Sequence, residues 1–101
     1  MITEYVRYVI STERATEFHD AYRKASAALD ASPECLGYEL TRGIEEPTNW
    51  ILRIRWDSLE GHEKGFRTGP NFSSFLAHVR PFLRDIQEMK HYEVTDVAAE
   101  L

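Results

Sequence analysis

WILRIRWD, residues 50–57, carries the clearest secondary-structure pattern in this chain. Its large apolar side chains, from Trp50 to Trp56, fall on every second position, which is the period of a β-strand. Residues 36–44 repeat the alternation, and EEPTN, residues 45–49, separates the two segments with a composition typical of a turn. The two segments therefore predict a β-hairpin with one large aromatic face.

The chain before this hairpin predicts one strand and one helix. Residues 2–10 are rich in β-branched and aromatic side chains, which favours a strand. In residues 13–32, apolar side chains such as Phe18, Tyr22 and Leu29 recur at three- and four-residue spacing. That spacing predicts an amphipathic helix with one buried stripe, ending before the proline that follows.

The chain after the hairpin predicts two helices and a last strand. A short helix over residues 59–67 is broken by Gly69, and Pro70 suits the first turn of the next helix. Pro81 should distort the second half of that helix, because proline lacks the backbone donor that a helix interior uses. Residues 86–97 look like a strand whose facing the alternation leaves open.

The order of these elements, βαββααβ, predicts an α+β fold of the ferredoxin-like type, an antiparallel sheet with helices on one face. With 101 residues, the chain has room for one domain, expected over residues 1–97, with residues 98–101 as a frayed tail. The other face of the sheet is left bare, and either solvent or a partner covers it. It should carry Tyr5, Arg7, Val9, Glu39, Thr41, Ile51, Arg53 and Arg55.

Charge and cysteine content exclude several classes of function. Twelve basic against seventeen acidic residues give a net charge of −5, so neither nucleic acid nor an anionic membrane is an expected partner. No apolar stretch approaches the ~20 residues that span a bilayer, and the first residues lack the layout of a signal peptide. The single cysteine, Cys35, excludes an internal disulfide. We expect a soluble, cytoplasmic protein.

Four segments carry a resemblance to a known family: IRWDSLEGH at residues 54–62, GPNFSSF at 69–75, VRPF at 79–82 and MKHYEV at 89–94. The chain resembles the antibiotic biosynthesis monooxygenase superfamily of dimeric α+β barrels. Members typically show a strand ending in Trp, a Ser two residues later, a helix with a His near its start, a break, and an aromatic-rich helix. The resemblance covers residues 2–94.

The resemblance implies a homodimer in which two sheets pack face to face into a barrel. Arg7, Arg53 and Arg55 would then meet Glu39 and its neighbours across the interface, and each subunit would keep a cavity between its sheet and its helices. Some characterised relatives oxidise quinols or polycyclic phenols with O2 and need neither metal nor flavin. Others degrade haem, process small signalling molecules, or have no known reaction.

The candidate residues for substrate binding and catalysis are mainly aromatic and imidazole side chains. Trp56 and Trp50 would form a flat wall on which an aromatic substrate stacks, although both could simply fill the core of a small domain. Phe72 would add to the same wall. His62, near the start of the short helix, is the candidate base if it faces the cavity rather than solvent, because its imidazole titrates near neutrality.

Further candidates lie on the second helix and the last strand. His78, a second catalytic candidate, and Arg80 occupy the flanks of the apolar stripe, where either one orients substrate oxygens or stays at the surface. On the last strand, either His91 or Tyr92 faces inward, and Tyr92 is a candidate donor to substrate. His19 lies at the edge of the first helix and is expected to face solvent.

Sites for metals and cofactors are not expected. The four histidines show no HxxxH or HxH spacing, and no cysteine pair is present. The sequence has no glycine-rich phosphate loop and no nucleophile elbow around Ser73 and Ser74. Haem is the less favoured alternative, since in the resemblance the haem-ligating position falls on Leu76, two residues from His78.

These observations lead to one preferred hypothesis and one rival. We expect a cofactor-independent monooxygenase that oxidises a small, flat aromatic of the quinol or phenol type with O2. The rival is a non-catalytic module that binds a small ligand or only dimerises, with its interior filled by side chains.

Overall fold

Four strands and two α-helices follow one another in the predicted order in the computed structural model, which describes residues 1–101. The strands are β1 (Ile2–Val9), β2 (Cys35–Arg42), β3 (Asn49–Trp56) and β4 (Ile86–Glu93). The helices are α1 (Ala15–Asp30) and α2 (Pro70–Val79). Three short helical segments complete the chain: η1 (Thr12–Arg14), η2 (Gly61–Phe66) and η3 (Arg80–Asp85).

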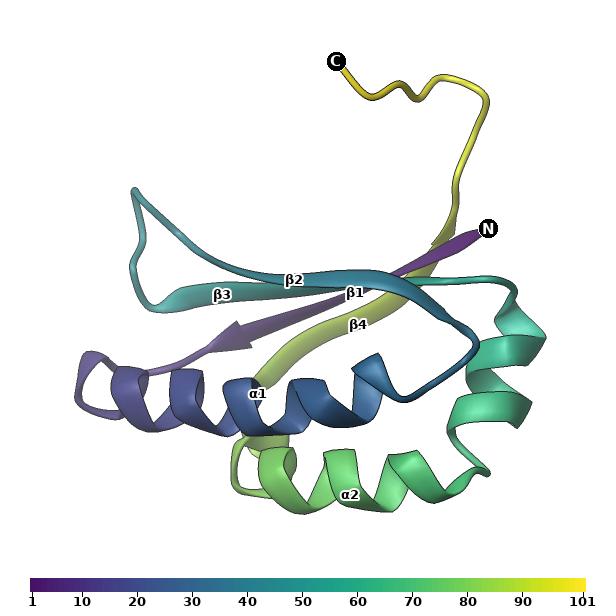
Figure 1. Cartoon of the computed structure of the whole chain (residues 1–101). Coiled ribbons are helices and arrows are strands. Elements are labelled where there is room, and N and C mark those ends of the chain that lie inside the picture. The colour runs from purple at the N-terminus through teal and green to yellow at the C-terminus, as the bar shows by residue number, and fades with distance from the viewer.

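The strands form one antiparallel sheet in the order β2-β3-β1-β4. Both α-helices lie on the same face of this sheet, which leaves the opposite face without a covering layer (Figure 1). The α+β, ferredoxin-like arrangement predicted from the sequence is confirmed.

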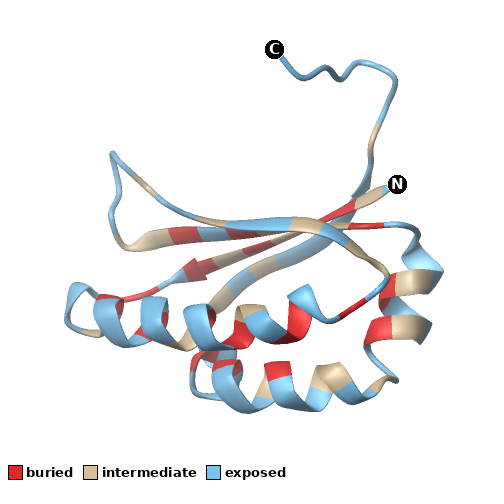
Figure 2. Ribbon diagram, viewed as in Figure 1, coloured by how far each residue is buried: buried red, intermediate tan, exposed pale blue.

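The core lies between the sheet and the helices, where the buried residues gather (Figure 2). Strand β3 is central, so its inward side chains are covered by strands on both sides and by helices below. All four of its even-numbered apolar residues are buried, as the alternation predicted: Trp50, Leu52, Ile54 and Trp56. From α1, Phe18 packs edge-on against Trp50 and Phe82, with ring centroids 5.2 Å apart in both pairs.

The prolines and a serine fix the limits of the helices after the hairpin. Pro70 occupies the first turn of α2, as predicted. Pro81 cannot donate to the helix ladder, and α2 ends at Val79, beyond which the chain continues as the 3-10 segment η3. The short helix expected over residues 59–67 is the π-helical segment η2, and Ser58 Oγ accepts the Gly61 N–H at 2.8 Å where the chain enters it.

The last strand is shorter than predicted and ends at Glu93 rather than at residue 97. Its pairing with β1 shifts register between Arg7 and Tyr8, so one extra residue of β4 is accommodated there. Residues 94–101 form neither helix nor strand, and the chain extends away from the sheet (Figure 1). No helix combines the length and the apolarity that crossing a membrane requires.

The uncovered face of the sheet carries the side chains that the alternation assigned to it. Register places Arg53 between Tyr5 and Glu39, and the Arg53 guanidinium forms an ion pair with Glu39 at 2.6 Å. Arg7 donates to Asn49 Oδ1 at 3.3 Å. Arg53 and Glu39 are thus cross-strand neighbours within one chain, and contacts of these charges with a second copy stay a prediction.

Candidate functional site

A cavity of about 360 Å³ lies between the inner face of the sheet and the layer formed by η2 and α2. Thirteen of its seventeen lining residues are hydrophobic, and Phe66, Phe72 and Phe75 form its aromatic wall. The two edge-to-face contacts of this wall join Phe66 to Phe72 and to Phe75, with centroids 5.6 and 5.7 Å apart. An apolar cavity of this size is typical of a site for a small organic ligand.

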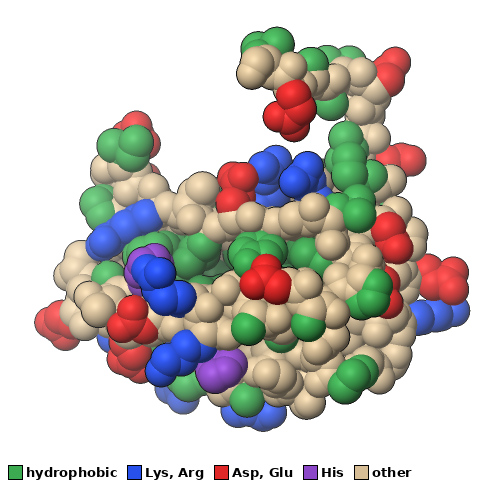
Figure 3. Space-filling model, in the orientation of Figure 1, with side chains coloured by type: hydrophobic (Ala, Val, Ile, Leu, Met, Phe, Trp, Pro, Cys, Tyr) green, Lys and Arg blue, Asp and Glu red, His purple; other side chains and the backbone are tan.

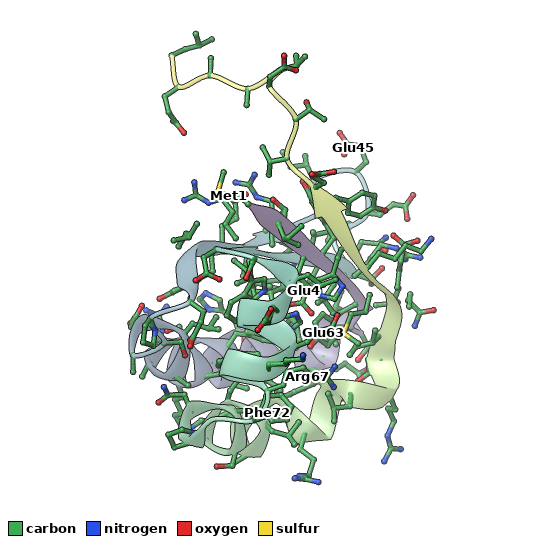
Figure 4. All side chains as sticks on the ribbon, turned by 90° about the vertical axis from the view of Figure 1, so that its right-hand side faces the viewer. Met1, Glu4, Glu45, Glu63, Arg67 and Phe72 are labelled. Atoms are coloured by element: carbon green, nitrogen blue, oxygen red, sulfur yellow. The ribbon has the colours of Figure 1, made fainter.

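Four polar residues line this cavity: Glu4, His62, Arg67 and His91. They come from β1, from η2 and the residue that ends it, and from β4, so three elements distant in sequence meet here. Figure 4 looks onto this side of the molecule, where Glu4 lies behind η2, with Arg67 and Phe72 below it. The short helix is itself informative, since π-helical segments are rare and occur frequently at functional sites.

Glu4 is a buried acid on the apolar face of β1. It is in phase with Val6 and Tyr8, and only 5% of its surface is exposed. Its Oε1 accepts a hydrogen bond from Trp56 Nε1 at 3.1 Å. Burial raises the pKa of Glu4, although the Trp56 hydrogen bond and the nearby His91 and Arg67 oppose that rise.

His62 lies directly against Trp56. The two rings stack with centroids 4.6 Å apart and planes 13° apart, and His62 is 5% exposed. Burial, together with the nearby charges of His91 and Arg67, lowers the pKa of His62 to about 4. The imidazole of His62 is therefore neutral at neutral pH, with one ring nitrogen protonated and the other free to accept a proton.

His91 completes a chain of three titratable groups. It pairs with Glu4 in the β1–β4 register, which brings its imidazole to the cavity side of the sheet. His62 Nδ1 lies 2.7 Å from His91 Nε2, and His62 Nε2 lies 3.4 Å from Glu4 Oε1. Of the three, Glu4 and His62 are buried, whereas His91 is exposed and can be reached by a ligand.

The three side chains form a relay that can carry a proton from the cavity to the buried carboxyl of Glu4. With Glu4 ionised, the Nε2–H of His62 points to Glu4, and His62 Nδ1 accepts the Nε2–H of His91. A proton that arrives on His91 Nδ1 then displaces the Nε2 proton to His62, which passes its own to Glu4. Since burial favours the neutral form of Glu4, the carboxyl is a suitable end for the relay.

The same three residues are also a possible metal-ligand set. Their ligand atoms lie within 4.8 Å of one another, and two histidines with one carboxylate are typical ligands for a divalent transition metal. However, His62 faces Glu4 and His91 with different ring nitrogens, so it connects them instead of converging with them on one point. As arranged, the cluster favours proton transfer. Histidine spacing could not reveal it because each residue belongs to a different element.

Tyr8 and Tyr22, whose hydroxyls hydrogen-bond to each other, also line the cavity. Burial raises the pKa of Tyr8 to about 12, so both phenols remain protonated at neutral pH. Two hydroxyls joined by one hydrogen bond leave a second O–H hydrogen, which can be donated to a ligand oxygen.

Neither tryptophan forms the cavity wall that the sequence led us to expect. Trp56 is 0% exposed and lies behind His62, so it contacts the site through His62, Glu4 and Phe66, whose ring centroid is 5.0 Å from that of Trp56. Trp50 is buried at the other end of β3, next to Phe18 and His19. Both expectations for these tryptophans are corrected, because the aromatic wall comes from η2 and α2. Of the predicted substrate-contact residues, Phe72 does line the cavity.

His78 on α2 and Arg80 at the start of η3 are exposed and lie outside the cavity. His78 and Arg80 do not line it, whereas Leu76 and Val79 do. Successive residues of a helix are about 100° apart, so a helix that turns Leu76 inward turns His78 toward solvent. The structure thus places His78 and Arg80 at the surface, which is the second of the two alternatives that the sequence left open. In this fold Leu76, the position of the haem ligand in the resemblance, is an apolar wall residue.

The facing of β4, which the alternation left open, is settled by its register with β1. His91 pairs with Glu4 and faces the cavity, while Tyr92 pairs with Thr3 on the outer face. There Tyr92 is 48% exposed and packs edge-on against Tyr5, with centroids 5.3 Å apart. Tyr92 is therefore not a donor to the cavity.

Two site residues escaped the sequence reasoning entirely. The signal for Glu4 was present, since an acid in phase with Val6 and Tyr8 on an apolar face predicts a buried carboxyl. Arg67 had no comparable signal, because an arginine after a short polar helix is ordinary at a surface.

Comparison with known proteins supports the fold and identifies the family. The family model described as antibiotic biosynthesis monooxygenase matches residues 1–78. The uncharacterized protein YczJ of Bacillus subtilis (strain 168) is 25% identical over 93 residues, which cover 92% of this chain and 98% of that protein.

Two solved structures show how closely the fold agrees. A mutant of SnoaB, a cofactor-independent oxygenase from Streptomyces nogalater, superposes with a TM-score of 0.79 at 16% identity, covering 98% of this chain and 97% of SnoaB. Rv0793 from Mycobacterium tuberculosis superposes with a TM-score of 0.76 at 13% identity, covering 97% of this chain and 98% of that protein. Since the family match spans most of the sequence, this chain belongs to the antibiotic biosynthesis monooxygenase family, some of whose members are cofactor-independent oxygenases.

Proposed function

We propose that this chain is a homodimeric, cofactor-independent monooxygenase that oxidises a small, flat, electron-rich aromatic of the quinol or phenol type with O2. One observation carries the proposal: a mostly apolar cavity of about 360 Å³ holds a hydrogen-bonded imidazole pair, backed by a buried carboxyl. The cavity suits an aromatic ring, and the imidazole pair supplies the base that such chemistry requires.

The first step is removal of the substrate's phenolic proton. His91 is the exposed member of the relay and takes this proton, while His62 passes its own to Glu4. The proton thus ends on a group that burial already inclines to be neutral, and the negative charge remains on the substrate.

The oxidation then needs only the substrate anion and O2. One electron passes from the anion to O2, giving a substrate radical and superoxide. The two combine at a ring carbon that bears hydrogen, and the peroxide anion takes back through the relay the proton that Glu4 holds. The resulting hydroperoxide loses water to leave a carbonyl group, and Glu4 is again ionised. One oxygen atom ends in the quinone product and the other in water, and the substrate supplies all four electrons. The protein contributes the base, the orientation and a water-poor site.

The proposed second subunit covers the outer face of the sheet. Aromatic and aliphatic side chains line a hollow of about 420 Å³ there beside Arg7 and Glu88: the exposed Ile51 and Tyr92 and the half-buried Tyr5. A second copy would bury this mixed surface and close the sheets into a barrel. Light scattering at micromolar concentration should give twice the chain mass of 11.8 kDa, and a species of 11.8 kDa would rule out the dimer.

The reaction is tested by oxygen uptake in the presence of a panel of hydroquinones and phenols. His91→Ala should lower kcat by about 10²-fold or more, the usual contribution of a general base. His78→Ala is the matched control, since it removes an exposed imidazole outside the cavity, and it should leave kcat within about twofold of the original chain.

Two results would count against the proposal. Saturable binding of these aromatics without oxygen uptake would identify a ligand-binding module instead of an oxygenase. Uptake that disappears after dialysis against EDTA and returns with a divalent cation would show that Glu4, His62 and His91 hold a metal. We expect uptake to survive EDTA.

A further inference from the structure

We propose that Arg67 is a catalytic residue that binds the phenolate oxygen formed when the substrate loses its proton, and that it lowers the pKa of the bound phenol. This inference rests on the proposed function, because it assigns the group that stabilises the anion in that reaction. It also narrows the substrate to aromatics whose ionisable hydroxyl enters the cavity at the His91 side.

The position of Arg67 is fixed from two sides. Its backbone N–H donates to the carbonyl oxygen of His62 at 3.1 Å, so the two residues share one turn at the end of η2. Its guanidinium carbon lies 5.6 Å from the centre of the Phe72 ring, which is part of the aromatic wall. Arg67 is exposed to solvent, yet it lines the same cavity as His62 and His91. Figure 4 shows it below Glu4 on this side of the molecule.

The charge of Arg67 is not neutralised by the protein. It is the only lysine or arginine that lines this cavity, and no carboxylate forms an ion pair with it. Arg14 and Arg53, in contrast, pair with Asp85 and Glu39 at 2.9 and 2.6 Å. An unpaired guanidinium over an apolar cavity is suited to an anionic oxygen, to which its planar set of N–H donors can bind.

The movement of charge during proton transfer places an anion where Arg67 can act. Before transfer, the negative charge is on buried Glu4; after transfer, Glu4 is neutral and the charge is on the substrate oxygen beside His91. Arg67 already acts electrostatically on this cluster, since its charge opposes the rise in the pKa of Glu4 and helps to lower that of His62. A fixed cation at the point where charge develops stabilises the anion without reorganisation.

The other side of the molecule offers no comparable group. A second, smaller cavity of about 190 Å³ lies between α1 and β2, where Figure 3 shows a recess with apolar side chains at its floor. It shares Tyr22 and Leu52 with the larger cavity, and its one arginine, Arg23, has no imidazole pair beside it. Arg67 is therefore the one arginine that lines the same cavity as the imidazole pair, where proton transfer would form the substrate anion.

The experiment is a pH titration of 4-nitrophenol, whose phenolate absorbs visible light, in the presence of excess protein. The original chain should lower the apparent pKa of the bound probe, because an opposite charge within a few ångströms favours the phenolate. The acid dissociation constant of the probe should rise by about tenfold. Arg67→Gln should abolish most of this shift, and Arg67→Lys should retain part of it. Lys64→Gln is the matched control, because Lys64 is an exposed cation of η2 that does not line the cavity.

The outcomes separate this inference from the proposed function. If the original chain and Arg67→Gln shift the pKa of the probe equally, while oxygen uptake persists, Arg67 has no role and the oxygenase proposal stands. If neither the original chain nor any variant binds the probe or shifts its pKa, the inference is wrong. The proposed phenol site then loses its support as well. With a substrate that is turned over, Arg67→Gln should lower kcat with little change in KM. The reason is that the ion pair between Arg67 and the phenolate oxygen forms only after proton transfer.

Discussion

The two ends of the cavity are built alike but differ in chemistry. Strand β1 contributes a buried polar side chain to each, Glu4 at one end and Tyr8 at the other, and their four-residue separation is about 14 Å along the strand. Glu4 is joined to Trp56 and His62, and Tyr8 is joined to Tyr22 of α1. Each polar group is therefore satisfied by a partner from another element.

Burial alone does not make a side chain a base. At the tyrosine end, burial raises the pKa of Tyr8 to about 12, so the pair can only exchange hydrogen bonds at neutral pH. At the histidine end, burial acts on groups of opposite charge type: it lowers the pKa of His62 to about 4 and raises the pKa of Glu4, so His62 is neutral and Glu4 holds a proton more readily than a carboxyl in water. Only this end has imidazole nitrogens that can accept a proton, and the exposed His91 connects them to the cavity.

Among substitutions at the two ends, Trp56→Phe at the histidine end should lower the stability of the protein most. This change removes the donor to Glu4 and leaves a void behind His62, so the free energy of unfolding should fall by about 2–3 kcal/mol. Urea denaturation of the purified chain measures it. A loss below about 0.5 kcal/mol would mean that neither the hydrogen bond nor the packing of the indole stabilises this end.

A smaller effect is expected in the pH dependence of stability. Because the pKa of His62 is lowered to about 4, the unfolded chain binds a proton below about pH 6.5 that the folded chain does not. The contribution of His62 to stability is thus lost as the pH falls from 6.5 toward 4. Glu4 acts in the opposite sense, since its raised pKa stabilises the folded chain at low pH.

Comparison with His62→Gln isolates the histidine share of this pH dependence. The advantage in Tm of the original chain over the variant should shrink steadily as the pH is lowered from 7 to 4. Thermal denaturation in a series of buffers measures this difference. An advantage that stays constant over this range would show that His62 takes up protons alike in the folded and unfolded chains.

The smallest effect is expected at the tyrosine end. Tyr22→Phe removes one hydroxyl of the pair and should lower the free energy of unfolding by about 1 kcal/mol, the net value of a typical hydrogen bond. It should also change kcat for oxygen uptake by less than about tenfold, since no proton is transferred at this end. A loss of kcat as large as that of His91→Ala would erase the proposed difference between the two ends.

The fold followed from the sequence wherever local pattern and burial agree. The alternation of residues 50–57 predicted the central strand, because β3 is buried on its helix-facing side along its full length. Pro70 and Pro81 predicted where α2 begins and where it is interrupted, since proline acts on the backbone next to it. These features depend on neighbours in the chain.

The site was predicted less well because it depends on how elements are placed against each other. His62 was chosen from its position after Trp56, yet its partners Glu4 and His91 come from strands at opposite ends of the chain. Whether His91 or Tyr92 faces inward is decided by the register of β4 on β1, which includes a bulge that the alternation of β4 does not reveal. His78 was misplaced because the rotation of α2 about its axis is set by tertiary packing.

The relay among Glu4, His62 and His91 is tested most directly by recording the ring nitrogen signals of the histidines by NMR over a pH series. Our account predicts that His62 stays neutral down to a pKa of about 4 and that its signals respond when His91 is replaced by alanine. A His62 that titrates near the ordinary value of about 6.5, with or without His91, would contradict the account.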